Sequence, residues 1–163
     1  MGLTLPGALE TLLNDLGFTW PEVDESELFD VGSHWTGLGG SLGDAVVQAD
    51  AAARQVPQAN EGDAVAAFLE KWSGSNAPVR VVSDAACGVE MGGAAIMLCA
   101  GVVLALKANT IANLAILAAE IAEALATAVP TFGASLAEIP VFKEVTQRVI
   151  NAAINEAVNA IIG

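Results

Sequence analysis

The chain has 163 residues, of which 54% are apolar, 19 are acidic and 6 are basic, for a net charge of -13. This length and apolar content are sufficient for one hydrophobic core, so we expect a single domain over residues 1–163. The excess of acid argues against nucleic acid as a partner, because proteins bind phosphate backbones with clustered lysine and arginine. Residues 1–75 hold 12 of the acidic and 2 of the basic residues, which predicts an acidic helical hairpin followed by a more apolar half, 76–163.

Helical periodicity dominates the first half. Leucines at three-to-four spacing predict a short amphipathic helix over residues 5–16. A much longer helix is predicted over residues 21–56, with carboxylates near its start that complement the helix dipole and Pro57 as its end. Asn60 is then placed to cap a short helix that ends at Trp72.

Glycine is unusually frequent in the long helix predicted over residues 21–56. Each glycine costs roughly 1 kcal/mol in a helix unless it allows another backbone to approach. We therefore expect close helix packing in this segment, or a break near Gly39 and Gly40. The glycines are Gly32, Gly37, Gly39, Gly40 and Gly43.

The second half contains the most apolar segment. No charge occurs from Met91 to Leu106, and Lys107 is followed by another uncharged stretch that ends at Ala119. Sixteen residues of helix span about 24 Å, slightly short of a bilayer core of about 30 Å. Two interpretations stay open: a buried core helix, or a membrane-active helix that passes into the bilayer.

In the membrane interpretation, Lys107 and Glu120 would face a lumen, because charges in lipid are expensive. Glu120 and Glu123 end the apolar run and could line a helix seam or a pore. Acid pairs three residues apart on a helix are more often a solvated face than a catalytic pair.

A clear amphipathic pattern over residues 142–161 predicts a last helix. Strand signals are nearly absent, because the chain has no tyrosine and its apolar spacing fits 3.6 rather than 2 residues. The predicted fold is all-α, with helical hairpins packed as an elongated bundle around a long apolar central helix.

Residues for catalysis, cofactors or metals are lacking. His34 is the only histidine, and Cys87 and Cys99 have no closely spaced partner, so zinc, haem and a nucleophilic triad are disfavoured. On one helix the two cysteines would lie roughly 18 Å apart, so we expect buried free thiols. The glycine run 37–43 lacks the lysine of a phosphate-binding loop. We expect no enzyme activity, no cofactor and no metal.

Four segments of the chain carry a family resemblance. They are residues 29–42 (FDVGSHWTGLGGSL), 60–68 (NEGDAVAAF), 72–74 (WSG, a Trp-x-Gly turn motif) and 131–140 (TFGASLAEIP). Together they resemble WXG-like domains of type VII (ESX) secretion. Such domains stand at the N-terminus of actinobacterial polymorphic toxins, including mycobacterial proteins in which an outer-membrane channel is fused to a necrotizing toxin.

The resemblance implies that two helices joined by a Trp-x-Gly turn form a hairpin. Two such hairpins would pair into a four-helix bundle that the secretion machinery recognises. Trp35-Thr-Gly37 lies inside the predicted long helix, whereas Trp72-Ser-Gly74 follows a helix, where a turn belongs. With Gly39, Gly40 and Gly43, these residues are the candidate partner or packing interface. The three tryptophans, Trp20, Trp35 and Trp72, are core residues or residues that await a partner.

The function implied is a non-catalytic targeting and interaction domain of a type VII secreted toxin, bound to a helical partner or to further copies of itself. The N-terminus lacks the basic region and apolar run of a cleaved signal peptide, so we expect another export route from the cytoplasm to the envelope or medium. The Tyr-x-x-x-Asp/Glu export signal is absent, so a partner chain would supply it. The alternative function is a membrane-inserting, channel-forming domain that assembles through its apolar helices.

Overall fold

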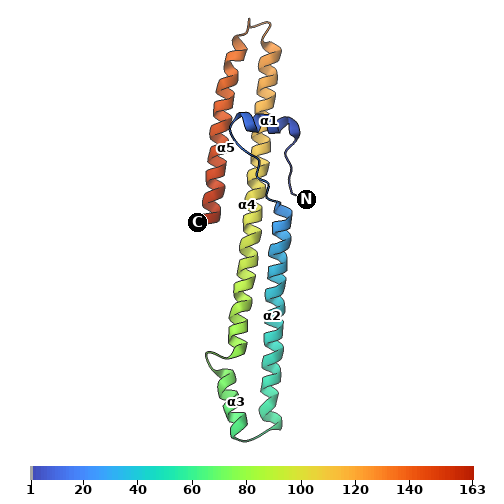
Figure 1. Ribbon diagram of the computed structural model, residues 1–163, viewed down its shortest axis with the longest axis vertical. Helices are drawn as coiled ribbons and strands as arrows, with labels where there is room; N and C mark the ends of the chain where they lie inside the picture. Colours follow the sequence, from blue (N-terminus) through green and yellow to red (C-terminus); the bar gives the residue numbers. More distant parts are fainter. Residues whose placement is uncertain (1) are drawn as a thin grey trace. The chain divides into compact units, whose positions relative to one another are not determined.

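The structure is a computed structural model that describes residues 2–163, and every regular element in that range is a helix (Figure 1). The all-α prediction is confirmed, as is the long apolar helix. The elements are, in chain order, α1 (Gly7–Asp15), α2 (Glu25–Ala59), α3 (Asp63–Ser73), α4 (Pro78–Thr127), the short 3-10 helix η1 (Ala134–Glu138) and α5 (Ile139–Ile162).

The start of α2 is set by a side-chain cap. The Asp24 carboxylate accepts hydrogen bonds from the backbone N–H groups of Ser26, at 2.9 Å, and Glu27, at 3.3 Å. These bonds satisfy donors that a helix leaves unpaired in its first turn, so α2 begins at Glu25 rather than at the predicted Pro21. At the other end α2 continues through Pro57, because a proline in the last turn removes only one hydrogen bond near the helix end.

The predicted cap of the third helix is wrong. The Asn60 side chain donates backwards to the Val56 carbonyl oxygen, at 3.0 Å, and so belongs to the end of α2. The chain then turns at Gly62, whose φ of 113° is readily accessible only to glycine. Gly62 is the residue before α3, and its carbonyl oxygen accepts a bond from the Val65 N–H at 3.0 Å.

The chain folds into two compact units, and α4 contributes to both. We call the first the terminal unit; it holds the residues up to Glu27 together with Cys99–Gly163. The second, the hairpin unit, is Leu28–Leu98. This division differs from the expected halves 1–75 and 76–163, because the N-terminal leucines are buried against the second part of the chain.

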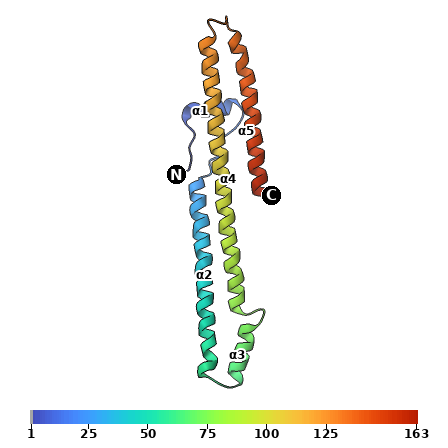
Figure 2. The ribbon, with the colours of Figure 1, turned by 180° about the vertical axis from the view of Figure 1, so that it is seen from behind.

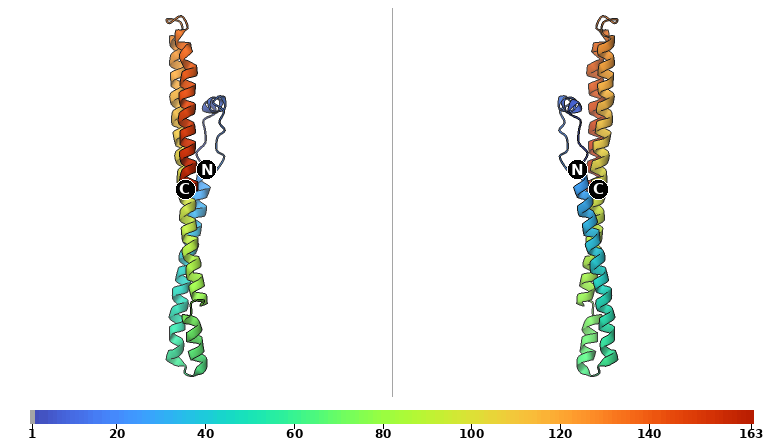
Figure 3. Two further views of the ribbon diagram at one scale, coloured as in Figure 1. Left: turned by 90° about the vertical axis from the view of Figure 1, so that its left-hand side faces the viewer. Right: turned by 90° about the vertical axis from the view of Figure 1, so that its right-hand side faces the viewer.

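In the terminal unit the second part of α4 runs antiparallel to α5, and α1 lies crosswise over one face of this pair (Figures 1, 2 and 3). Leucines of α1 and the following turn meet both helices in the core, so the predicted leucine stripe is the buried face of α1. The buried members are Leu13, Leu16, Leu114, Leu117 and Ile150. Burial of one such side chain contributes about 1.5–3 kcal/mol.

Polar bonds fix the end of α1 to α5. The Gln147 side chain donates to the Leu16 carbonyl oxygen at 3.1 Å, and the Lys143 ammonium lies 3.3 Å from the Asp15 carboxylate. Phe18 and Trp20, in the segment that leaves α1, pack against the same core. One of the three tryptophans is therefore a core residue of the terminal unit.

In the hairpin unit, α2 runs antiparallel to α3 and to the first part of α4 (Figures 1 and 2). The predicted arrangement of a long helix, a turn and an antiparallel helix is present. Cys87 and Cys99 are both free, as predicted, but Cys87 is exposed and Cys99 half-buried. The expectation that both thiols are buried is wrong, because Cys87 lies on an uncovered side of α4 and Cys99 is only partly covered.

Two leucines of α4 test the core of the terminal unit. Leu117 is fully buried and Leu125 is 58% exposed. We expect Leu117→Ala to lower the free energy of unfolding by about 2–5 kcal/mol, because a buried leucine leaves a cavity when it is truncated. Leu125→Ala should change it by less than about 0.5 kcal/mol. Denaturant unfolding followed by circular dichroism measures both, and equal losses would contradict this core.

Candidate interaction surfaces

Glycines bring α2 and α4 into direct backbone contact. A β-carbon added to Gly32 would lie 2.7 Å from the Gly93 carbonyl oxygen, and one added to Gly93 would lie 2.6 Å from the Gly32 carbonyl oxygen. Two turns further along α2, a β-carbon on Gly39 would lie 2.9 Å from the Ala86 carbonyl oxygen. No other residue fits at such separations. We call Gly32, Gly39 and Gly93 the glycine seam.

Three of the other candidate glycines lie away from this seam. A β-carbon on Gly37, Gly40 or Gly43 would meet no atom within 4 Å. Gly74 has only ordinary contacts, at 3.5 Å, with the end of α3. Of the predicted interface glycines, the structure thus places Gly39 in close packing inside the chain, whereas Gly37, Gly40 and Gly43 have open space beside them.

Sequence reasoning gave no site role to Gly32 or Gly93, although both belong to the seam. The seven-residue spacing of Gly32 and Gly39 places them on one face of α2, and that spacing was the available signal. The partner glycine on α4 had no such signal, because its place opposite Gly32 depends on how the two helices are aligned.

An exposed apolar stripe runs along α2. Val31, Trp35 and Leu38 follow each other at four and three residues, which places them on one side of the helix, and all three are exposed. Trp35 is 47% exposed, and its ring passes within 3.8 Å of the position of a β-carbon on Gly92. The indole therefore lies along α4 while much of it faces outward. We call these three residues the α2 stripe; it contains the Trp35-Thr-Gly37 motif.

A second exposed stripe, which we call the α5 stripe, lies on the terminal unit. Val141, Val145 and Val149 recur at four-residue spacing on the outer side of α5, and all three are exposed. An adjacent side of the same helix carries Thr146 and Ile150, which are buried. The predicted amphipathic helix therefore has its apolar residues on more than one side, and only one side is covered by this chain.

The apolar segment of α4 is also largely uncovered. The segment Asp63–Thr127, which contains α3 and α4, includes one helix that is long and apolar enough to cross a membrane, and only 11% of its most apolar window is buried. A buried core helix would be covered by other parts of the protein, but this chain alone does not cover the apolar segment of α4. Met91 and Glu123 are exposed, whereas Leu106 and Glu120 are half-buried.

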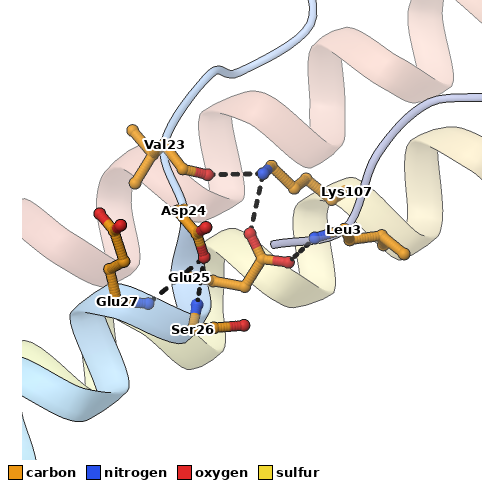
Figure 4. Close-up of polar contacts among 7 residues, drawn as sticks. All are labelled: Leu3, Val23, Asp24, Glu25, Ser26, Glu27 and Lys107. Atoms are coloured by element: carbon orange, nitrogen blue, oxygen red, sulfur yellow. Dashed lines mark hydrogen bonds and ion pairs between the residues drawn. The ribbon is translucent and has the colours of Figure 1, made fainter. Parts of the chain in front are cut away.

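Lys107 forms a buried ion pair in the terminal unit (Figure 4). Its ammonium lies 2.8 Å from a carboxylate oxygen of Glu25 and donates to the Val23 carbonyl oxygen at 2.6 Å. The other Glu25 oxygen accepts the backbone N–H of Leu3. The two side chains are 3% and 4% exposed, and the Lys107 ammonium is 5.6 Å from the ring centre of Trp20. Lys107 is therefore satisfied inside the protein and does not face a lumen in this structure.

The pair ties three distant segments together: the N-terminal segment at Leu3, the start of α2 at Glu25, and α4 at Lys107. The Lys107 hydrogen bond, followed by the Leu3 N–H, holds the pKa of Glu25 below its ordinary value. Sequence reasoning missed Glu25 because 82 residues separate it from Lys107. The lone cation in a long apolar run was the signal that a buried acid must exist.

At the link between α3 and α4, Trp72 is held in a fixed position. Its indole N–H donates to the Asp50 carboxylate at 3.2 Å, and its ring stacks on Phe68 with 5.6 Å between ring centres. Asp50 also pairs with Arg54 at 2.6 Å. The Trp72 bond, followed by Arg54, lowers the pKa of Asp50. The Trp72-Ser-Gly74 motif therefore lies at an interhelical link, as a turn motif requires.

These features define an all-helical domain in which a glycine-packed hairpin and an apolar helix pair present uncovered apolar sides. The family model of the WXG100 like domain matches residues 7–149. The chain belongs to this family, and is a helical domain related to type VII secretion. No curated protein and no solved structure matches it.

The family match confirms the resemblance at the level of the domain. It begins at residue 7, so it includes α1, whereas the segments that carry the resemblance begin at residue 29. The crosswise helix and its leucine core are thus part of the family domain and not an addition to it. Both Trp-x-Gly sequences lie within the matched range.

The glycine seam predicts opposite effects for two neighbouring substitutions. Gly40→Ala should stabilise the protein by up to about 1 kcal/mol, because alanine is the better helix former and the added methyl group meets open space. Gly39→Ala should destabilise it by about 1–3 kcal/mol, because its methyl group must displace Glu90 or separate the helices. The shift of the denaturation midpoint measures both, and a shift of the same sign would contradict the seam.

Breaking the buried ion pair gives another prediction. Lys107→Met should lower the free energy of unfolding by about 3–5 kcal/mol, because it leaves the Glu25 carboxylate buried without a cation. Adding Glu25→Gln should recover much of this loss, since the amide is neutral and its oxygen still accepts the Leu3 N–H. A double variant no more stable than the single one would contradict the ion pair.

Acid denaturation provides an independent check of the same pair. The pKa of Glu25 is lower in the folded chain than its ordinary value of 4.5, so the stability it contributes is fully present above that pH. The contribution should disappear as the pH falls towards the lowered folded pKa. Glu25→Gln should remove this part of the acid dependence and leave the rest.

Proposed function

We propose that this chain is a non-catalytic targeting and interaction domain of a type VII secreted toxin, and that it acts by helix packing with a partner chain. The observation that carries the proposal is the exposed α2 stripe of Val31, Trp35 and Leu38. Apolar residues at this spacing form the contact face of a packed helix. A partner helix laid along the stripe would remove it from water and complete a bundle.

The residues themselves support an interaction domain over an enzyme. Within residues 2–163, no three His, Cys, Asp or Glu side chains come together in a way that could hold a metal ion. The only histidine, His34, is exposed on α2 beside the stripe. The buried polar groups Glu25 and Lys107 satisfy each other, and Thr110 donates to its own helix at Leu106. Their roles are structural.

The toxin and export parts of the proposal depend on the resemblance and on the family. WXG100-like membership supports export by a route that needs no cleaved signal peptide, from the cytoplasm to the cell envelope or the medium. The chain has no tyrosine, so a partner would carry the Tyr-x-x-x-Asp/Glu signal. Loss of the domain from the culture medium when the type VII ATPase is deleted would support export, and unchanged amounts would oppose it.

A second candidate function is a membrane-inserting domain that forms a channel from several copies. The exposed apolar helix in Asp63–Thr127 is the observation in its favour. Met91 and Leu106 would then contact lipid, and Glu120 and Glu123 would line the lumen. Lys107 would first have to leave Glu25, which makes the buried pair a barrier to insertion.

The α2 stripe can be tested with a matched pair of triple variants. One carries Val31→Gln, Trp35→Gln and Leu38→Gln; the control carries the same type of change on the α5 stripe, at Val141, Val145 and Val149. Sedimentation of the purified chain with a small helical partner of the same secretion system measures the complex. We expect the α2 variant to lose the complex and the α5 control to retain it, because only α2 contacts the partner.

Retention of the complex by the α2 variant, or equal loss in both, would contradict helix packing at this stripe. The same preparations, made without detergent and mixed with liposomes, distinguish the second candidate. A chain that stays out of the lipid fraction opposes constitutive insertion. Flotation of the wild-type chain with liposomes would instead favour the channel.

A further inference from the structure

The hairpin unit is hollowed around Trp72. The larger hollow has a volume of about 660 Å³ and is lined by the valines Val46, Val47 and Val79 and by the side chains of Trp72, Arg54 and Arg80, among others. An adjoining apolar hollow of about 220 Å³ shares Val46, Trp72 and Val79 with it. Because the same three side chains form the wall of both, the two are one continuous depression, which we call the Trp72 groove.

The floor of the groove is rigid before any ligand arrives. Trp72 stacks on Phe68 and donates its indole hydrogen to Asp50, so two contacts within the chain hold the ring in place. An aromatic surface that is already fixed loses little conformational entropy on binding. This rigidity makes Trp72 a good surface for apolar side chains of a ligand.

Cations are concentrated at the groove although the hairpin unit is acidic. The unit has eight acidic and only three basic residues, and the groove is lined by two of these three cations and by one acid, Asp50. Arg54 and Arg80 line the groove, and Lys71 lines a neighbouring hollow of about 380 Å³ beside Pro78, which also lines the apolar hollow.

Arg54 is engaged by Asp50, whereas neither Lys71 nor Arg80 forms an ion pair within residues 2–163. An unpaired arginine at an apolar floor, with an unpaired lysine at a neighbouring hollow, suits a ligand that has a carboxylate next to apolar groups. A polyanion does not fit, because the rest of the unit is acidic and would repel it.

We propose that the Trp72 groove binds a short amphipathic peptide segment of a partner protein, in which an Asp or Glu follows or precedes apolar residues. The apolar residues lie on Trp72, Val46 and Val79, and the carboxylate meets Arg80 with Lys71 nearby. A second copy of this chain is the weaker occupant, because two molecules of net charge -13 repel each other. The site rests on the proposed partner-binding function but is separate from the α2 stripe.

Selection of short random peptides from a display library for binding to the full chain tests the groove. The affinity of each selected peptide is then measured by fluorescence anisotropy with a labelled copy. We expect selected sequences to combine acidic with apolar residues. Replacing their Asp and Glu by Asn and Gln should weaken binding about tenfold or more, since a charge-assisted hydrogen bond is lost. Arg80→Gln and Lys71→Gln should weaken the acidic peptides in the same way.

Arg148→Gln is the matched control, because Arg148 is an exposed arginine of the terminal unit, paired with Glu144. It should leave peptide affinity unchanged. The α2 stripe variant should also bind the peptides normally, so a failure of helix packing is distinguishable from a failure of the groove. Circular dichroism shows whether each variant is folded.

Several results would overturn the proposal. They are the selection of no binding peptide, selected peptides without acidic residues, equal affinity for the neutral peptides, and unchanged affinity in Arg80→Gln. A wild-type chain that is dimeric alone and becomes monomeric in Arg80→Gln would assign the groove to a second copy instead.

Discussion

The buried ion pair between Lys107 and Glu25 is the constraint on which the terminal unit depends. A charge inside an apolar helix is tolerated only when another group neutralises it, so the acid must be delivered to α4 from elsewhere in the chain. Glu25 does this at the first residue of α2, and its second oxygen holds the N-terminal segment at Leu3. The intervening α1 is thereby brought onto α4 and α5, where its leucines form the core.

The two units solve helix packing differently. In the terminal unit large side chains fill the space between helices, whereas in the hairpin unit Gly32, Gly39 and Gly93 let the backbones touch. Where the backbones touch, no large side chain fits between the helices, and Val31, Trp35 and Leu38 are exposed on α2. A family of domains that works by association benefits from this distribution, because the apolar surface is available to a partner.

Local signals in the sequence were reliable where a single helix decided the outcome. Periodicity identified α1 and α5, the long uncharged apolar run identified α4, and glycine frequency indicated close packing on α2. Signals at helix ends were less reliable, because several groups compete there: Asp24 caps α2, Pro57 is tolerated in its last turn, and Asn60 serves α2 instead of α3. The family resemblance came from short strings around the two Trp-x-Gly sequences and needed no structure.

The sequence by itself determined an all-α, acidic chain with a long apolar helix, because composition and a 3.6-residue period are local properties. Only the tertiary structure decided that Lys107 is paired with Glu25, that Gly39 but not Gly40 is in the seam, and that Arg54 and Arg80 line one groove with Trp72. Each of these depends on which residues of different helices face each other. That alignment is set by packing across the chain and is not encoded in any one segment.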